Sequence, residues 1–216
     1  MTKFFLWLLI LPQIVMAAPV SILFVGDSHS VGPFGQTLDK LLRTIPEAEV
    51  ASYASCGSIA KWWYTGTATP CGYFFHPENS GIEQGTKGPT PIFSTLFSNQ
   101  KPHLTIVELG ANYAGMPSDE FAINDMKRMA KEIRDGGSEC LWVTKPDSRD
   151  RTAIPRILKL TKDAVGEYCT IFDSTKVTTY PATGGDGVHY WNTLGTPIAK
   201  KWAGLVFDKV NQLLKQ

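Results

Sequence analysis

The sequence lacks the charge excess and the cysteine spacing that mark nucleic-acid-binding and zinc-binding proteins. Its 216 residues contain 21 lysines and arginines against 20 aspartates and glutamates, so the formal net charge is only +1. Proteins that bind nucleic acid usually show a clear basic excess. None of the four cysteines forms a C-x-x-C pair, which argues against a tetrahedral metal site. We therefore expect no nucleic-acid partner, no metal and no cofactor.

The chain also lacks internal boundaries. No linker rich in glycine, serine or proline divides it, and we find no repeat of fixed period and no low-complexity tract. Its length is sufficient for one domain with a sizeable hydrophobic core. The sequence thus predicts a single domain.

No apolar run is long enough to span a membrane, which takes about 20 residues. The longest candidate, Phe4 to Leu11, follows a single lysine and precedes small residues up to Ala17. That layout is typical of a secretory signal. We predict a signal peptide at residues 1–17 and an exported domain, periplasmic or secreted, at 18–216 with no membrane span after cleavage; the alternative is an uncleaved anchor.

Export changes the interpretation of the cysteines, because an oxidising compartment allows disulfides to persist. The even number, Cys56, Cys71, Cys140 and Cys169, predicts two bridges with three possible pairings. Cys140 and Cys169 each lie at the start of neighbouring predicted strands, whereas a Cys56–Cys71 bridge would hold the long connection that follows Gly57 next to that glycine. Position therefore favours Cys56–Cys71 and Cys140–Cys169.

Apolar segments alternate with amphipathic segments along the chain. Strands are expected at 19–27, 48–55, 103–112, 139–146 and 169–174, and helices at 34–45, 121–133, 154–168 and 193–214. This alternation predicts an α/β fold with about five parallel strands and helices on both faces, a flavodoxin-like three-layer sandwich.

Polar residues and glycines follow the predicted strands, at the edge where ligands bind in such sheets. Ser28 follows the first strand, Gly57 the second and Asn112 the third, while Asp186 and His189 precede the last helix. A serine hydroxyl becomes a nucleophile when a histidine takes its proton, and a carboxylate can orient that histidine. We predict Ser28, His189 and Asp186 as catalytic residues, with the Ser28 and Gly57 N–H groups and the Asn112 amide as oxyanion donors.

Each residue also has a structural interpretation. Asp27 and Ser28 can cap a helix, Asn112 suits a turn, and Asp186 suits an ordinary loop. Their coincidence at one edge of the sheet favours catalysis.

Four ordered blocks resemble the SGNH hydrolase superfamily, also called GDSL-type esterases. They are Gly26-Asp27-Ser28, the glycine of "SCGS", Gly110-Ala111-Asn112, and the D-x-x-H of Asp186 to His189. The resemblance implies the roles just given. His29 stands where leucine is common, a form similar to the SGNH domains of some bacterial O-acyltransferases that act on glycans. Tyr113 stands where aspartate is common.

The connection from 58 to 101 is long and rich in aromatic residues. One interpretation is an insertion whose Trp62 and Trp63, together with His29 and Tyr113, form a substrate rim; the other is a small satellite core. His29 could equally be a packing residue.

Together these features predict an exported serine esterase that hydrolyses an acyl ester, above all O-acetyl groups on a cell-envelope or environmental polysaccharide. The alternatives are a lipase or thioesterase, an O-acyltransferase on glycans, and a non-catalytic glycan-binding module. The expected partner is an acylated small molecule or glycan.

Overall fold

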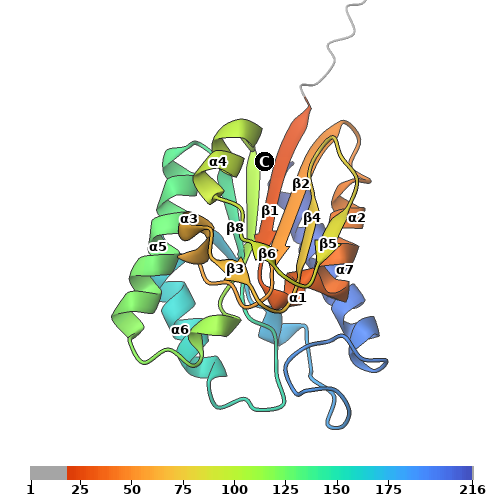
Figure 1. Cartoon of the computed structure of the whole chain (residues 1–216), viewed down its shortest axis with the longest axis vertical. Helices are drawn as coiled ribbons and strands as arrows, with labels where there is room; N and C mark the ends of the chain where they lie inside the picture. The colour runs from red at the N-terminus through yellow and green to blue at the C-terminus, as the bar shows by residue number, and fades with distance from the viewer. Residues whose placement is uncertain (1–18, 216) are drawn as a thin grey trace, which may run out of the picture.

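The computed structural model describes residues 19–215, and the predicted signal peptide at 1–17 lies outside them. A seven-stranded sheet forms the centre, with the strand order β5-β4-β2-β1-β7-β8-β9 (Figure 1). Its strands are β1 (Val20–Gly26), β2 (Ala48–Ser55), β4 (Tyr73–His76), β5 (Glu83–Gly85), β7 (Leu104–Glu108), β8 (Glu139–Val143) and β9 (Thr170–Phe172).

Five of these strands are parallel, as predicted. β1 pairs with β2 on one side and β7 on the other, and β8 and β9 follow in the same direction. In chain order the parallel strands run 2-1-3-4-5, the flavodoxin-like arrangement. Both faces of β1 and β7 are buried, which explains their nearly continuous apolar sequences.

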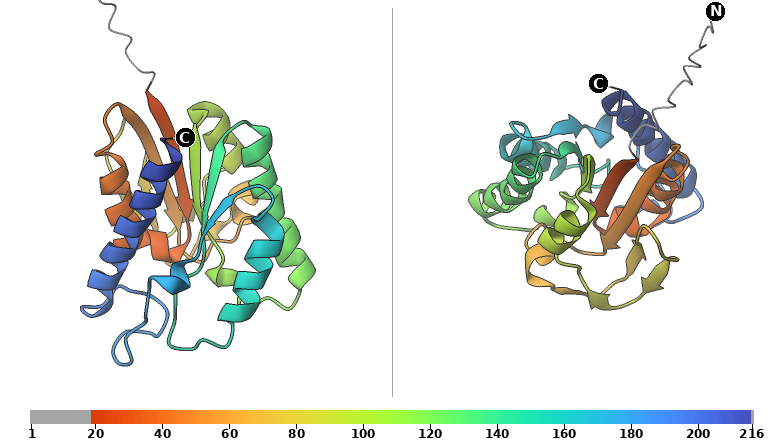
Figure 2. Two further views of the ribbon diagram at one scale, coloured as in Figure 1. Left: turned by 180° about the vertical axis from the view of Figure 1, so that it is seen from behind. Right: turned by 90° about the horizontal axis from the view of Figure 1, so that it is seen from above.

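Helices cover both faces of the sheet, so the three layers are confirmed (Figure 2). α2 (Pro33–Leu42) and α7 (Gly195–Leu213) pack together on one face, and α5 (Asp119–Asp135) and α6 (Ile154–Val165) pack together on the other. A separate apolar core lies on each side, and Trp202 of α7 stacks on Phe34 of α2 with ring centroids 3.6 Å apart. Among the described residues, no helix is long and apolar enough to cross a membrane.

Part of the 58–101 connection adds strands to the edge of the central sheet. β4 pairs antiparallel with β2, and β5 pairs with β4, so a hairpin adds two strands to the edge of the parallel sheet. The rest comprises α3 (Trp62–Thr65), α4 (Phe93–Gln100) and a two-stranded ribbon of β3 (Ala68–Thr69) and β6 (Gly88–Pro89). Most of its aromatic side chains are packed; Trp63, Phe74, Phe75 and Phe93 are buried. Trp63 and Phe93 belong to the large core on the α5 and α6 side of the sheet, so these two are packed in the main core and not in a separate satellite core.

Both predicted disulfides are present. Cys56 bonds to Cys71, and Cys140 bonds to Cys169. The second bridge joins the start of β8 to the residue before β9, at the edge of the sheet opposite the carboxyl ends of the strands. The first lies at those carboxyl ends, where the predicted site residues gather.

Candidate active site

Ser28 lies at the point where the central strand turns into a helix. β1 ends at Gly26, and the short helix α1 (Ser28–Val31) begins immediately after Asp27. The Asp27 carboxylate accepts a hydrogen bond from the His29 N–H at 3.0 Å and so caps this helix. Within the Gly-Asp-Ser block, Asp27 therefore has the structural role of capping the helix. This cap sets the position of Ser28, the predicted catalytic residue.

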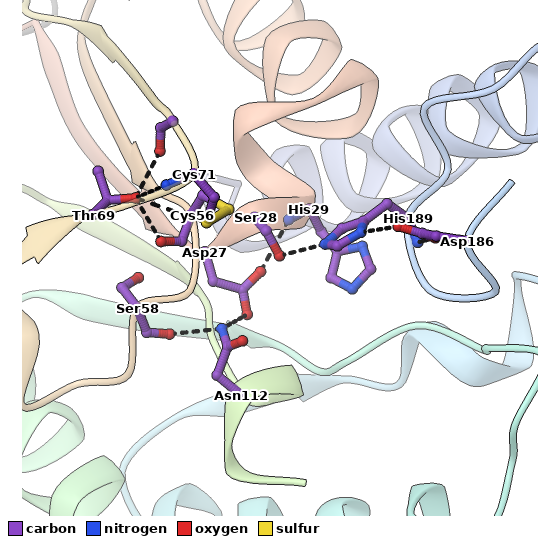
Figure 3. The surroundings of a disulfide bond; sticks show 11 residues. Asp27, Ser28, His29, Cys56, Ser58, Thr69, Cys71, Asn112, Asp186 and His189 are labelled. Carbon is purple, nitrogen blue, oxygen red and sulfur yellow. Dashed lines mark hydrogen bonds and ion pairs between the residues drawn. A yellow bond between two sulfur atoms is a disulfide. The ribbon is translucent and has the colours of Figure 1, made fainter. Parts of the chain in front are cut away.

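His189 and Asp186 reach Ser28 from the other end of the chain. His189 Nε2 lies 2.9 Å from Ser28 Oγ, and His189 Nδ1 lies 2.6 Å from Asp186 Oδ2 (Figure 3). The other Asp186 oxygen accepts the backbone N–H groups of Val188 and His189, both at 2.8 Å. A tight turn thus folds the histidine over the aspartate, which is how residues only three apart can pair.

The loop that carries this pair is anchored to the domain through two tyrosines. Tyr180 donates to the carbonyl oxygen of His189 at 3.1 Å, and its oxygen accepts the Gly187 N–H at the same distance. Tyr190 is buried and donates to the carbonyl oxygen of Asp147 at 2.8 Å. These bonds fix the loop on both sides of His189.

The electrostatics of the pair suit a base held by an anion. Partial burial acts to raise the pKa of Asp186, but hydrogen bonds from the His189 ring and from two backbone N–H groups outweigh it and hold that pKa well below its usual value. Asp186 is therefore ionised at neutral pH. A carboxylate in this position stabilises the imidazolium that forms when His189 accepts a proton.

The predicted oxyanion donors Gly57 and Asn112 follow β2 and β7, the two neighbours of β1, at the same end of the sheet as Ser28. Gly57 has a φ of +84°, a conformation that favours glycine. The Cys56–Cys71 bridge holds the turn beside it, and the Thr69 hydroxyl donates to the carbonyl oxygen of Cys56 at 2.7 Å (Figure 3). Among the described residues, the N–H groups of Ser28 and Gly57 have no hydrogen-bond acceptor. Both are thus available to a substrate oxygen.

The side chain of Asn112 lies in the same region, and its amide already donates two hydrogen bonds. Its Nδ2 donates to the carbonyl oxygen of Ser58 at 2.9 Å and to Asp27 Oδ2 at 3.3 Å. The side chain therefore ties the loop after β7 to the loop after β2. Donation to an oxyanion would require Asn112 to give up the longer of these bonds, the one to Asp27.

Three of the four predicted rim residues are not on a rim. His29, Trp63 and Tyr113 are 3%, 0% and 0% exposed. α1 turns His29 under α7, where it lies near the rings of His189 and Trp202, and burial lowers its pKa well below the usual value, so it is neutral. Of the two interpretations of His29, a rim residue or a packing residue, the structure therefore favours the packing residue.

Tyr113 and Trp63 point into the core behind the Gly57 loop. The Tyr113 hydroxyl accepts the Ala60 N–H at 3.0 Å and donates to Asp125 at 2.7 Å, which fixes the chain after Gly57. Trp62 is half-buried, and a Cβ built on Gly57 would lie 3.4 Å from its ring. Trp62 alone of the four borders the oxyanion region.

Three further residues at the site were not identified from sequence. Glu108, at the end of β7, is fully buried and accepts a hydrogen bond from Ser30 at 2.8 Å. Lys145 follows β8, is 6% exposed, and donates to Ser148 at 2.8 Å. Trp191 is 44% exposed and stacks on the His189 ring. Glu108 was hidden inside an apolar strand sequence, and Trp191 lies in an irregular loop with no periodicity to show its direction.

Two shallow hollows flank the Asp186–His189 turn. One, of about 280 Å³, is lined by Gly185, Asp186, His189, Trp191 and Asn192. The other, of about 290 Å³, is lined by Arg149, Asp150, Asp186, Gly187 and Val188. A larger hollow of about 490 Å³ lies between α4 and the end of α5, at the opposite end of the sheet from Ser28. Of these three hollows, the two smaller ones include residues of the Ser28–His189–Asp186 hydrogen-bonded series.

A scan against protein-family models finds no match, and a search of curated proteins finds none. Solved structures do match over nearly the whole chain. A GDSL-like lipase of Bacteroides thetaiotaomicron has 12% identity and a TM-score of 0.55, with 90% of this chain and 93% of that chain covered.

The chain has the fold of the SGNH, or GDSL-type, hydrolases. Two acetylesterases share it as well. A catalytic mutant of Axe2, an acetylxylan esterase of Geobacillus stearothermophilus, has 11% identity, 89% and 95% coverage and a TM-score of 0.60. A peptidoglycan O-acetylesterase has 11% identity, 92% coverage of both chains and a TM-score of 0.58. At these identities the likeness establishes the SGNH fold that the motifs predict.

Proposed function

We propose that this SGNH-fold protein is an exported serine esterase that works through an acyl-enzyme on Ser28. One observation carries the proposal: the continuous hydrogen-bonded series from Ser28 Oγ to His189 Nε2 at 2.9 Å, and from His189 Nδ1 to Asp186 at 2.6 Å. A nucleophile bonded to a base, which is in turn bonded to an orienting anion, is the arrangement that activates a serine.

In the proposed mechanism each step involves a named atom. Ser28 Oγ attacks the ester carbonyl carbon while His189 Nε2 takes the hydroxyl proton. The oxyanion that forms is bound by the N–H groups of Ser28 and Gly57 and by Asn112. His189 then returns the proton to the leaving alcohol. Water attacks the acyl-enzyme while His189 takes its proton, and the second oxyanion intermediate then collapses. The carboxylic acid leaves, and His189 returns the proton to Ser28 Oγ.

The substrate that we propose is an O-acetyl group on a cell-envelope or environmental polysaccharide. The hollows beside the triad are shallow, and charged or amide side chains such as Asp186, Arg149 and Asn192 line them. A long acyl chain would need a deep apolar tunnel, and the hollows found near Ser28 among the described residues are not of that kind. The shared fold with an acetylxylan esterase and a peptidoglycan O-acetylesterase supports the same substrate class.

Two features support export. The two disulfides suit an oxidising compartment, and the residues that precede Pro19 have the composition of a secretory signal.

The test is Ser28→Ala, with Ser94→Ala, at an exposed serine of α4, as the control. We expect Ser28→Ala to release no acetate from acetylated glycans and to resist labelling by an organophosphonate, whereas Ser94→Ala keeps both properties. Full activity of Ser28→Ala would contradict the covalent mechanism. If the protein transferred acetyl groups to a glycan hydroxyl without releasing acetate, its activity would be acyl transfer and not hydrolysis.

A further inference from the structure

Three exposed apolar side chains lie close in sequence to the catalytic histidine, and one of them, Trp191, contacts its ring. Among the described residues, five large hydrophobic side chains are exposed, and three of them, Val188, Trp191 and Leu194, fall within seven residues of sequence. Isolated exposed hydrophobic residues are ordinary, but a cluster beside a reactive group points to a ligand. Trp191 is the largest of the three and is 44% exposed, whereas Trp63, Trp142 and Trp202 are fully buried.

The buried neighbour Tyr190 and a contact with Gly32 fix the orientation of the Trp191 side chain. The preceding Tyr190 is buried and bonds to the carbonyl oxygen of Asp147 at 2.8 Å, so the chain presents the next side chain outward. One edge of the indole lies against Gly32, where a Cβ would come within 1.9 Å of Trp191 Nε1. Any larger residue at position 32 would displace the ring. The indole is therefore held in place before any ligand arrives.

One side of the ring system meets the catalytic base directly. The rings of Trp191 and His189 stack with centroids 4.4 Å apart and an interplanar angle of 26°. A ligand against the exposed part of the indole would thus lie within a few ångströms of the group that receives and returns the proton. The adjoining hollow of about 280 Å³ adds the polar groups of Asp186 and Asn192.

We propose that Trp191 is the sugar-stacking platform of this enzyme, which binds the pyranose ring that carries the ester. This inference rests on the proposed esterase function. The electron-rich face of an indole attracts the weakly positive C–H groups of a sugar face, and the neighbouring carboxylate and amide can bind its hydroxyls. An acyl chain would gain nothing from those polar neighbours. The alcohol part of the ester therefore lies on the Trp191 side of the site.

The experiment compares Trp191→Ala and Trp191→Phe with Ile82→Ala, a control at an exposed apolar residue just before β5, at the end of the sheet away from Ser28. The substrates are an acetylated xylo-oligosaccharide, an O-acetylated peptidoglycan fragment, ethyl acetate and ethyl octanoate, followed by pH-stat. We expect Trp191→Ala to lose at least about 10-fold in kcat/KM on a sugar ester, mainly through KM, and less than about 3-fold on ethyl acetate. Ile82→Ala should stay near the parent protein on every ester, and Trp191→Phe, which keeps an aromatic face, should lose less on the sugar esters than Trp191→Ala does.

Three other outcomes would contradict the inference that Trp191 is a sugar-stacking platform. Equal losses on ethyl acetate and on the sugar esters would mean that Trp191 only supports His189. A selective loss on ethyl octanoate would mean that it binds the acyl chain, and no loss on any ester would remove it from the site.

A binding measurement separates this inference from the proposed function. Calorimetric titration of Ser28→Ala with the two sugar esters should show binding that weakens at least about 10-fold when Trp191→Ala is added. Such binding without turnover by the parent protein would overturn the esterase and keep the sugar platform. Turnover with no effect of Trp191→Ala in either assay would overturn the platform and keep the esterase.

Discussion

Asn112 is the site residue whose contacts divide most clearly between structure and catalysis. Its amide bonds to Ser58 in the resting protein and is also a candidate donor to the oxyanion. We predict that Asn112→Ala lowers kcat by about 100-fold or more with a smaller change in KM, because an oxyanion donor acts mainly in the transition state. Steady-state kinetics on an acetyl ester test this.

The melting temperature of the same variant shows how much of the loss is structural. Removal of the Ser58 bond should cost about 1 kcal/mol of stability, a modest drop. A rise in KM alone would make Asn112 a substrate-binding residue. A collapse of the melting temperature together with kcat would make it a structural residue.

The individual site residues were predictable where a motif and a strand end coincide. Ser28 follows an apolar strand, and Asp186 and His189 share one short turn, so their meeting follows from the topology of a parallel sheet. The direction of a side chain in irregular backbone was not predictable. His29 turns inward because α1 starts one residue earlier, and Trp191 turns outward because Tyr190 is the buried anchor.

The two disulfides should stabilise the folded protein by similar amounts, but they lie at different places in the fold. They close 15 and 29 residues, which in the loop-entropy model corresponds to about 3 and about 3.6 kcal/mol. Only the Cys56–Cys71 bridge touches the site, because Cys56 adjoins Gly57 and a Cβ built on Gly57 would lie 3.7 Å from Cys71 Sγ.

We predict that the paired variants Cys56→Ala/Cys71→Ala and Cys140→Ala/Cys169→Ala lower the free energy of unfolding by similar amounts and differ in activity. The first pair should lose at least about 10-fold in kcat, because a shift of the Gly57 N–H misplaces an oxyanion donor. The second should keep most of its kcat. Urea unfolding and acetyl-ester kinetics on both variants provide the comparison, and equal losses of kcat would refute the division.

At the scale of elements, the parallel strands and long helices were predictable and the 58–101 connection was not. β2 occupies the expected residues 48–55, and α5 ends at the glycines after Asp135 as its capping signal indicates. β4 and β5 are short, and their pairing with β2 depends on long-range register that no local pattern encodes. An aromatic run such as Tyr73 to Phe75 fits an edge strand and a lid equally well.

A pair of carboxyl groups, Asp27 and Glu108, is buried next to Ser28 and should make the stability of the whole molecule depend on pH. Burial raises the pKa of Asp27 to about 6, although the His29 N–H and the neighbouring Glu108 act to lower it. Burial, followed by the charge of Asp27, raises the pKa of Glu108 well above its usual value. Glu108 Oε1 has no hydrogen-bond partner among the described residues, as suits a neutral carboxylic acid.

The sign of the linkage follows from these shifts. Both groups hold their protons more tightly in the folded protein than in the unfolded chain, so the folded state is favoured at low pH and loses stability as the pH rises. For Asp27 the loss begins near 3.8 and is complete above about 6. Glu108 continues the loss to higher pH.

Glu108→Gln should flatten this pH dependence. The amide keeps the shape of the side chain and an oxygen that can accept the hydrogen bond from Ser30, but it cannot ionise, so the contribution of Glu108 itself disappears. We predict that the unfolding free energy of the variant rises relative to that of the parent protein at each step from pH 5 to pH 8. Urea titrations at each pH measure both curves, and Glu132→Gln on α5 controls for the loss of a carboxylate elsewhere. Parallel curves for Glu108→Gln and the parent would show that Glu108 does not titrate with folding.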